Sequence, residues 1–298
     1  MATSIKLGFV PEHFSTPIHY AQIKKFFDDS AIKVELIEYP SGSGHLIQSL
    51  KNKEIDYAIG LTEAFVRGIC NGDDKYQILG TYVESPLCWS ISTGANRDEL
   101  TSKDQLKGKK IGVSRIGSGS YVMSFVLGLQ SDFPEPFFQD FVVLDNFKNL
   151  RDSVNLKEGT ETSDAFMWEY FTTKKYYDNK EVKKIGEIYT PWPSWVIVGS
   201  VDNDKKVDTA LLSGLQAGID YFNANPEESV KFINDNLDYS LEDAKEWLKS
   251  VKFSKDVSKL DYQKSIANTT SVLTKANVVT ESADILNERL RKFVVQKQ

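Results

Sequence analysis

The sequence predicts an α/β protein of two lobes, each with a mixed, mostly parallel sheet flanked by helices. Short apolar runs rich in β-branched residues alternate with longer segments of helical period, which is typical of βαβ units. A second strand, glycine turn and helix lie within residues 108–130 and repeat the order of elements found at the start of the chain. The length of 298 residues suits two hydrophobic cores better than one or three.

Hydrophobic periodicity defines the elements of the first lobe. A short apolar or alternating run predicts a strand, whereas apolar residues that recur with helical spacing predict a helix. In chain order the predicted elements are strand 5–10, helix 17–27, strand 33–39, helix 43–53 and strand 56–61.

Two stretches of the second lobe are similar to stretches of the first. "KKIGVS" (109–114) is similar to "IKLGFV" (5–10). "ETSDAFMWEYF" (161–171) is similar to "EIDYAIGLTEAF" (54–65), because in each an Asp enters a short apolar strand that runs into a Glu and an aromatic residue. Since both similarities occur in the same order, we expect two lobes of related topology.

Two further strands, 84–94 and 193–202, are predicted to cross between the lobes and form a hinge. The predicted boundaries then place residues 1–94 and 196–298 in lobe 1 and residues 95–195 in lobe 2. The last third of the chain is predicted to be helical. Asn225 with Glu228, and Ser240 with Asp243, have the spacing of helix-capping boxes.

Composition excludes several classes of protein. With 41% apolar and 26% charged residues the chain is typical of a globular protein, and its net charge of −6 argues against a nucleic-acid partner. No apolar run is long enough to span a membrane. The first residues contain no signal peptide, which predicts a cytoplasmic protein; a periplasmic or extracellular location is the alternative if a leader has been removed.

Metal, cofactor and catalytic motifs are missing from the sequence. Cys70 and Cys88 are the only cysteines, and the three histidines have no metal-site spacing. No HExxH, GxSxG or Cys-His pattern occurs, and the glycines match no nucleotide-binding loop. We therefore predict no metal, no cofactor and no catalytic residue.

A small-molecule site is predicted from the residues that follow the strands. Ligands of open α/β sheets bind outside the carboxyl ends of the strands, and small, polar and aromatic residues gather there. The candidate ligand-binding residues are His13, Phe14, Ser43, Gly44, His45, Thr62, Glu63, Trp89, Gly117, Ser118, Gly119, Ser120, Tyr121, Asn146, Trp168, Glu169, Trp192 and Trp195.

These residue types have specific uses in a binding site. Gly117 and Gly119 allow a sharp turn near a ligand, and the adjoining serines and helix N–H groups offer donors to an anionic or carbonyl group. The tryptophans can stack on a planar ligand. Glu63 and Glu169 can accept hydrogen bonds from an amino group. The alternatives are tight turns, core aromatic residues and carboxylates at helix starts.

The segments together resemble the type II periplasmic-binding-protein fold, and more narrowly its NMT1/THI5-like group, which includes sulfonate- and pyrimidine-binding solute receptors and thiamin-pyrimidine synthases. The similarity covers nearly the whole chain and is carried by "PIHYAQIKKFF", "EIDYAIGLTEA", "LKGKKIGVSRIGSGSY", "SDAFMWEYF" and the C-terminal helices. It implies a two-lobed α/β fold that closes over one small ligand, with the crossing strands as hinge.

The sequence departs from the synthase branch of this group. Where that branch carries a lysine that holds pyridoxal phosphate and a nearby histidine, residues 56–64 read "DYAIGLTEA". Where it has a cysteine-rich run, this chain reads "TPWPSW". We therefore expect a binding protein for a planar or anionic ligand, most closely a thiamin-precursor-like aminopyrimidine. A thiamin-pyrimidine enzyme, a sulfonate receptor of an ABC transporter and a sensor with a regulatory partner remain alternatives.

Overall fold

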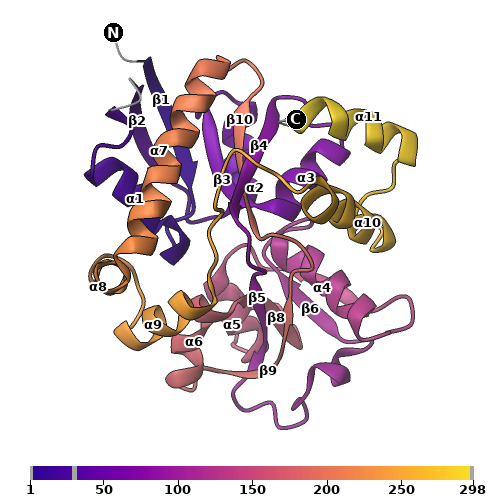
Figure 1. Cartoon of the computed structure of the whole chain (residues 1–298). Helices are drawn as coiled ribbons and strands as arrows, with labels where there is room; N and C mark the ends of the chain where they lie inside the picture. Colours follow the sequence, from indigo (N-terminus) through magenta and orange to yellow (C-terminus); the bar gives the residue numbers. More distant parts are fainter. Residues whose placement is uncertain (1–2, 29–31, 296–298) are drawn as a thin grey trace. The chain divides into compact units, whose positions relative to one another are not determined.

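The computed structural model describes residues 3–28 and 32–295, which form two compact units (Figure 1). Unit 1 comprises residues 1–85, 192–270 and 279–298, and unit 2 comprises residues 86–191 and 271–278. The strand predicted at the first crossing, β5 (Cys88–Gly94), belongs to unit 2. The strand predicted at the return, β10 (Trp195–Ser200), belongs to unit 1.

Unit 1 is built on a mixed sheet. Besides β10, its strands are β1 (Thr3–Phe9), β2 (Ile32–Glu38), β3 (Tyr57–Leu61) and β4 (Tyr76–Val83). Their order is β2-β1-β3-β10-β4. β1 pairs in parallel with β2 and β3, and β10 runs antiparallel to β3 and β4. The buried, largely apolar sequence of β3 is typical of a sheet that is covered on both faces.

The sheet of unit 2 follows the same plan. Besides β5, its strands are β6 (Lys110–Val113), β7 (Asp140–Val143), β8 (Ala165–Glu169) and β9 (Val182–Tyr189), in the order β7-β6-β8-β5-β9. β5 runs antiparallel to β8 and β9, as β10 does in unit 1. The similar stretches of sequence form β1 and β6, and β3 and β8, which hold equivalent places. The prediction of two α/β lobes of related topology is confirmed.

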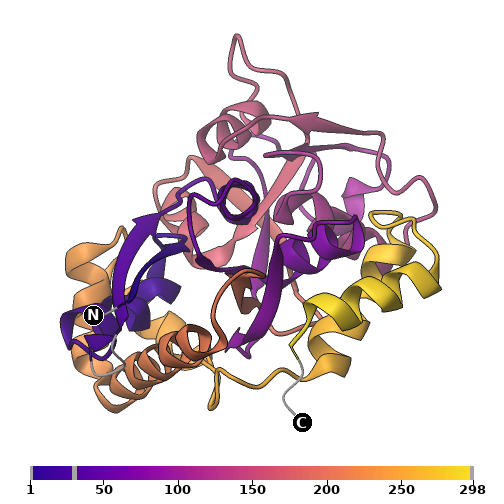
Figure 2. The ribbon, with the colours of Figure 1, turned by 90° about the horizontal axis from the view of Figure 1, so that it is seen from above.

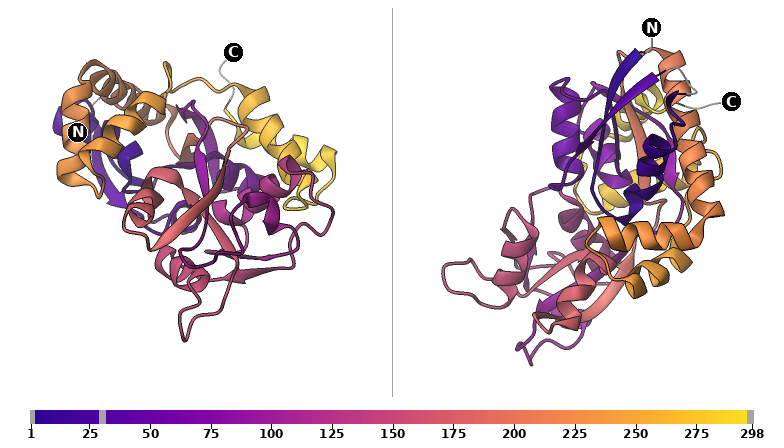
Figure 3. Two further views of the ribbon diagram at one scale, coloured as in Figure 1. Left: turned by 90° about the horizontal axis from the view of Figure 1, so that it is seen from below. Right: turned by 90° about the vertical axis from the view of Figure 1, so that its left-hand side faces the viewer.

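Helices cover the sheet of unit 1. They are α1 (Thr16–Ile23), α2 (Ser43–Lys51), α3 (Thr62–Cys70), α7 (Lys205–Ala224), α8 (Pro226–Asn236), α9 (Leu241–Ser250) and α11 (Ala283–Phe293). α7 packs along α1 (Figure 1). Gly218 permits this close approach, since a Cβ there would lie 2.3 Å from the carbonyl oxygen of Pro17. α11 packs against α3 (Figure 2), and α8 lies beside α9 (Figure 3).

Unit 2 contains helices α4 (Gly119–Gln130), α5 (Phe147–Val154) and α6 (Tyr170–Asp178). α10 (Asn268–Lys275) begins in unit 1 and continues in unit 2. α4 contacts β6 and β8, whereas α6 contacts β5, β8 and β9. A hydrophobic cluster that includes Leu150 and Phe166 joins α5 to the sheet, and Phe147 and Trp168 pack at its margin.

The capping box predicted at Asn225 and Glu228 does not form. Ser240 caps α9 as predicted, with Oγ accepting a hydrogen bond from Asp243 N at 3.1 Å. The Asn225 side chain instead donates to the Tyr221 carbonyl of the preceding helix, and Glu228 accepts from Tyr221 Oη at 2.7 Å. Asn225 is the C-cap of α7 and the N-cap of α8, and its side chain hydrogen-bonds to α7.

Within residues 3–28 and 32–295, no helix combines the length and the apolar character needed to cross a bilayer.

Candidate functional site

In unit 1 the candidate residues gather at the carboxyl ends of the parallel strands. His13 and Phe14 follow β1, Ser43 follows β2, and Glu63 follows β3 at the start of α3. Because β10 runs antiparallel, its first residue lies at this same edge: Trp195 pairs with Leu61, the last residue of β3. We call this end of the sheet, where the parallel strands of unit 1 finish, the unit 1 edge.

Short polar contacts fix the backbone of the unit 1 edge. Ser43 Oγ accepts a hydrogen bond from Leu61 N at 2.9 Å, which ties the start of α2 to the end of β3. Thr62 Oγ1 donates to the Pro193 carbonyl at 2.5 Å, and Thr62 N donates to the Ser194 carbonyl at 3.1 Å. Ser43 and Thr62 are therefore buried residues whose hydroxyl groups fix the backbone.

Glu63 is the most unusual side chain of the unit 1 edge. It is 0% exposed, and its Oε2 accepts a hydrogen bond from Trp192 Nε1 at 2.9 Å. Its Oε1 has no hydrogen-bond partner among the residues that the structure describes. Burial raises the pKa of Glu63 to about 7, against the smaller opposing effects of its own backbone N–H and of Trp192. A carboxyl group that changes charge near neutral pH is thus held beside an indole.

Trp195 adds a second unsatisfied polar atom to this edge. Its side chain is 3% exposed, and its Nε1 finds no acceptor in the described part of the chain. The Phe14 ring lies against it, with 5.2 Å between ring centroids. The indole is therefore held by packing while its donor group is left unused.

The two histidines of the candidate set lie in different surroundings. His45 is exposed on α2, one residue after Gly44, and its ring meets Tyr39 edge to face. His13 is fully buried and stacks between Tyr239 and Trp247, with 4.3 Å from its ring centroid to each. This burial lowers the pKa of His13 well below its usual value of 6.5. His13 is thus a neutral member of an aromatic core.

The buried imidazole predicts a loss of stability in acid. The unfolded chain takes up the His13 proton near the ordinary pKa of 6.5, and the folded chain only at lower pH. The free energy of unfolding is therefore highest above pH 6.5, the ordinary pKa, and falls as the pH drops below it. Urea unfolding over a pH series should show this fall, and it should be smaller in His13→Phe. Equal pH dependence in both proteins would contradict the assignment.

In unit 2 the glycine turn after β6 is closed by its own serines. Gly117 has φ +79°, a conformation that favours glycine. Ser118 Oγ caps α4 by accepting from Tyr121 N, and Ser120 Oγ accepts from Ser114 N at 3.2 Å. Gly119 begins the helix. The Tyr121 ring packs against Phe141.

The other candidates of unit 2 follow β7 and β8. Asn146 caps α5 through a hydrogen bond from Asn149 N at 2.9 Å. Trp168 is half-buried and stacks on Phe147 with 4.9 Å between ring centroids. Glu169 is buried and caps α6, since its Oε2 accepts from Thr172 N at 2.7 Å. Burial raises the pKa of Glu169 to about 7 despite these bonds.

Each unit holds a Trp and a Glu near the carboxyl ends of its strands. In unit 2, Trp89 near the start of antiparallel β5 pairs with Glu169, and its buried Nε1 has no acceptor among the described residues. In unit 1, Trp195 starts antiparallel β10 and pairs with Leu61, and Glu63 is the second residue of the helix after β3. The tryptophans hold equivalent places, whereas Glu169 ends its strand and Glu63 lies two residues beyond the end of β3.

Several relevant features escaped the sequence-based prediction. Tyr239 and Trp247, which enclose His13, come from the far end of the sequence. Trp247 lies on α9, in the part of the chain for which the sequence predicted only helices. Ile116 and Tyr189 are exposed at strand ends of unit 2, although apolar residues at those positions predict burial.

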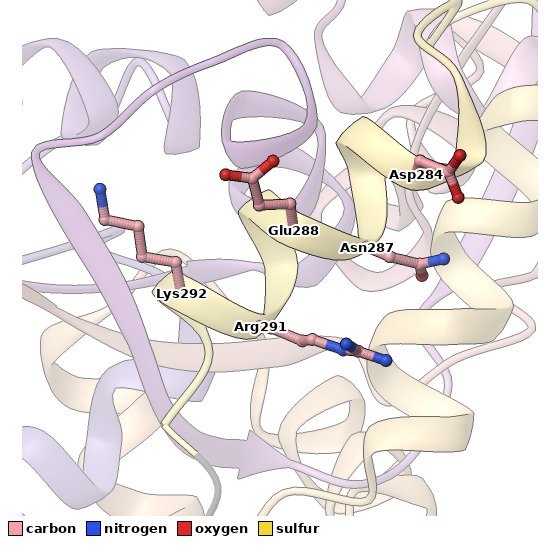
Figure 4. A pocket seen from close by; sticks show the side chains of 5 residues that line it. All are labelled: Asp284, Asn287, Glu288, Arg291 and Lys292. Carbon is pink, nitrogen blue, oxygen red and sulfur yellow. The ribbon is translucent and has the colours of Figure 1, made fainter.

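A surface pocket of about 500 Å³ lies elsewhere, on α11 of unit 1 (Figure 4). Its lining residues are Asp284, Asn287, Glu288, Arg291 and Lys292. None of them is a candidate predicted from the sequence. Within the described ranges, no group of three or more His, Cys, Asp and Glu side chains is arranged to hold a metal ion.

The chain matches two family models. Residues 89–188 match the model described as Ca3427-like PBP, and residues 12–131 match the model described as NMT1/THI5 like. No curated protein matches it in a sequence search. The resemblance seen in the sequence, to the type II periplasmic-binding-protein fold and its NMT1/THI5-like group, is confirmed.

Solved structures add a relative of high similarity. The conserved Candida albicans CA3427 gene product, described as defining a new family with the generic periplasmic binding protein fold, is 49% identical, with a TM-score of 0.95 over 100% of this chain and 97% of that one. The periplasmic aliphatic sulphonate binding protein SsuA from Escherichia coli is 12% identical, with a TM-score of 0.73 over 100% and 94%. The alkanesulfonate-binding SsuA from Xanthomonas axonopodis pv. citri, bound to MOPS, is 12% identical, with a TM-score of 0.75 over 99% of each chain.

Proposed function

Since the chain belongs to the family that the Candida albicans CA3427 gene product defines, we propose that it is a binding protein for a planar small molecule, most closely a thiamin-precursor-like aminopyrimidine. The fold is that of solute-binding proteins. The proposal assigns ligand binding to the carboxyl ends of the strands, where α/β sheets take their ligands.

The observation that carries the proposal is the pair of unsatisfied polar atoms at the unit 1 edge. Glu63 Oε1 and Trp195 Nε1 are both buried without a partner in the described chain. Native proteins satisfy nearly all buried polar groups, and each exception calls for an explanation such as a missing ligand or water. A ligand that offers a donor and an acceptor would satisfy both atoms.

Aromatic side chains beside these atoms support a planar ligand. Trp192 donates to Glu63, and Phe14 packs on Trp195. In unit 2, Trp168 is half-buried beside Phe147 and keeps part of its ring accessible. The remaining strand-end residues, a cytoplasmic location and a transporter or regulatory partner stay predictions.

A thermal-shift panel tests the proposed function. The compounds are aminopyrimidines, thiamin and its fragments, pyridoxal phosphate, sulfonates and carboxylates. A ligand at about 100 times its Kd adds about 2.7 kcal/mol of stability, which should raise the Tm by several degrees. An aminopyrimidine hit supports the proposal. A hit on sulfonates alone moves the ligand to the class that the SsuA proteins bind, and no hit with any compound contradicts the proposal.

A further inference from the structure

Resting on the proposed function, we propose that Glu63 and Trp195 read the polar edge of the ligand, with the carboxylate as acceptor and the indole N–H as donor. The ligand then presents an N–H group beside a lone pair and carries no negative charge at this edge. A 4-aminopyrimidine has such an edge, because its exocyclic amino group adjoins a ring nitrogen. A sulfonate has none, because it offers acceptors only.

Both atoms lie at one end of one sheet. Trp195 pairs with Leu61, and Glu63 stands two residues after Leu61 at the first turn of α3. Trp192, three residues before Trp195, holds the other oxygen of Glu63 at 2.9 Å. The carboxyl group is thus oriented by one indole and leaves its Oε1 for another donor.

The acid at the start of α6 in unit 2 serves as a helix cap, and Glu63 does not. Glu169 is the N-cap of α6, the place that Leu61 holds before α3, and Thr172 N donates to its Oε2. Glu63 is the second residue of α3, and α3 has no side-chain cap hydrogen bond. Capping therefore does not occupy the Glu63 carboxyl group, and its Oε1 keeps an unused acceptor in the described chain.

When Glu63 is ionised, above its pKa, charge disfavours an anion at this edge. The groups that act on the Glu63 carboxyl are its own backbone N–H and Trp192, with no Lys, Arg or His among them in the described chain. An anionic group placed against Oε1 would meet a carboxylate in a desolvated setting without a neutralising cation, where like charges repel strongly. An N–H donor, neutral or positively charged, gains a charge-assisted hydrogen bond instead.

Calorimetric titration with matched probes tests the assignment. The probes are 4-amino-2-methylpyrimidine, 2,4-dimethylpyrimidine, in which a methyl group replaces the amino donor, and methanesulfonate. With the wild-type chain we expect the amino compound to bind about tenfold more tightly than the dimethyl compound, because a hydrogen bond to a charged group is lost. Methanesulfonate should not compete with it.

Substitutions test whether the side chains of Glu63 and Trp195 bind the ligand. Glu63→Gln, which removes the charge and keeps the shape, should weaken binding of the amino compound about tenfold, and Trp195→Phe about fivefold. Asp208→Asn is the matched control. Asp208 is also a buried carboxyl of unit 1, but it accepts from Tyr57 Oη at 2.8 Å and Tyr57 begins β3, at the opposite end of the strand. Its substitution should leave the Kd unchanged.

The outcomes separate this inference from the proposed function. Equal binding of the two pyrimidines, or unchanged binding of the amino compound in both Glu63→Gln and Trp195→Phe, overturns the inference while a binding protein remains. Binding of methanesulfonate alone overturns it too and leaves a receptor of another ligand class. If no compound of the whole panel binds, the proposed function fails and the inference fails with it. Circular dichroism confirms that each variant is folded before its binding result is interpreted.

Discussion

Replacing Glu63 with glutamine is expected to raise the free energy of unfolding by about 3 kcal/mol at about pH 8 and to leave it nearly unchanged near pH 4. The reason is the pKa of Glu63, which burial raises from 4.5 to about 7. Between these two values the folded chain keeps a proton that the unfolded chain has released. Stability is therefore full below the lower value and falls as the pH rises through the higher one. Glutamine has no proton to lose and escapes this cost.

The measurement is urea unfolding of the two proteins over a pH series, without ligand. The difference in free energy should open between the two pKa values and then level off. Glu169→Gln is the comparison, because the pKa of Glu169 is raised to about 7 as well. Its gain should be smaller by about 1 kcal/mol, since the carboxylate also caps α6. A pH-independent difference for Glu63→Gln would contradict the raised pKa.

A stabilising substitution at Glu63 would itself bear on function. A buried carboxyl without a cation lowers the stability of the ligand-free protein, and residues that lower stability concentrate at functional sites. If Glu63→Gln both stabilises the chain and weakens binding of the amino compound, the carboxyl group that lowers the stability of the wild-type chain is also the group that binds the ligand. Stabilisation without any effect on binding would leave Glu63 as a structural oddity.

The fold could be predicted because its signals are local. The periodicity of residues 43–53, and the order of strand, glycine turn and helix within 108–130, depend on neighbouring residues only. The structure has α2 in the first segment and α4 at the end of the second. The similar stretches at β1 and β6, and at β3 and β8, indicate a shared topology. Strands at equivalent positions of two sheets are buried in the same way and therefore favour similar residues. Helix 17–27 was predicted too long: α1 ends at Ile23, and Lys25 adopts φ 62°.

The state of the candidate site could not be predicted, because it depends on contacts between distant residues. Glu63 meets Trp192 across 129 positions, and His13 is enclosed by residues more than two hundred positions away. Small polar residues at strand ends are ambiguous for another reason. Ser118 and Asn146 satisfy helix N–H groups, and ligand contacts demand the same residue types. The sequence therefore predicts candidate positions at strand ends, but it does not show which side chains keep an unused polar atom.

Trp247→Ala is expected to cost about 3–5 kcal/mol of unfolding free energy, the usual range for deleting a buried indole. Trp247 is among the largest fully buried side chains, and it contacts Phe14, Phe222 and Phe253 as well as His13. Without it α9 loses these aromatic contacts with the rest of unit 1. Urea unfolding measures the loss, and Trp247→Phe should cost less because a ring still fills most of the space.

The same variant tests the account of His13. Removing one of its two stacking partners opens the imidazole to water, so the pKa of His13 should rise toward its usual value of 6.5. At acidic pH the free energy of unfolding of Trp247→Ala should then depend less on pH than that of the wild-type chain, even though it is lower overall. A large loss of stability with the full acid dependence retained would mean that burial by Trp247 is not what keeps the imidazole neutral.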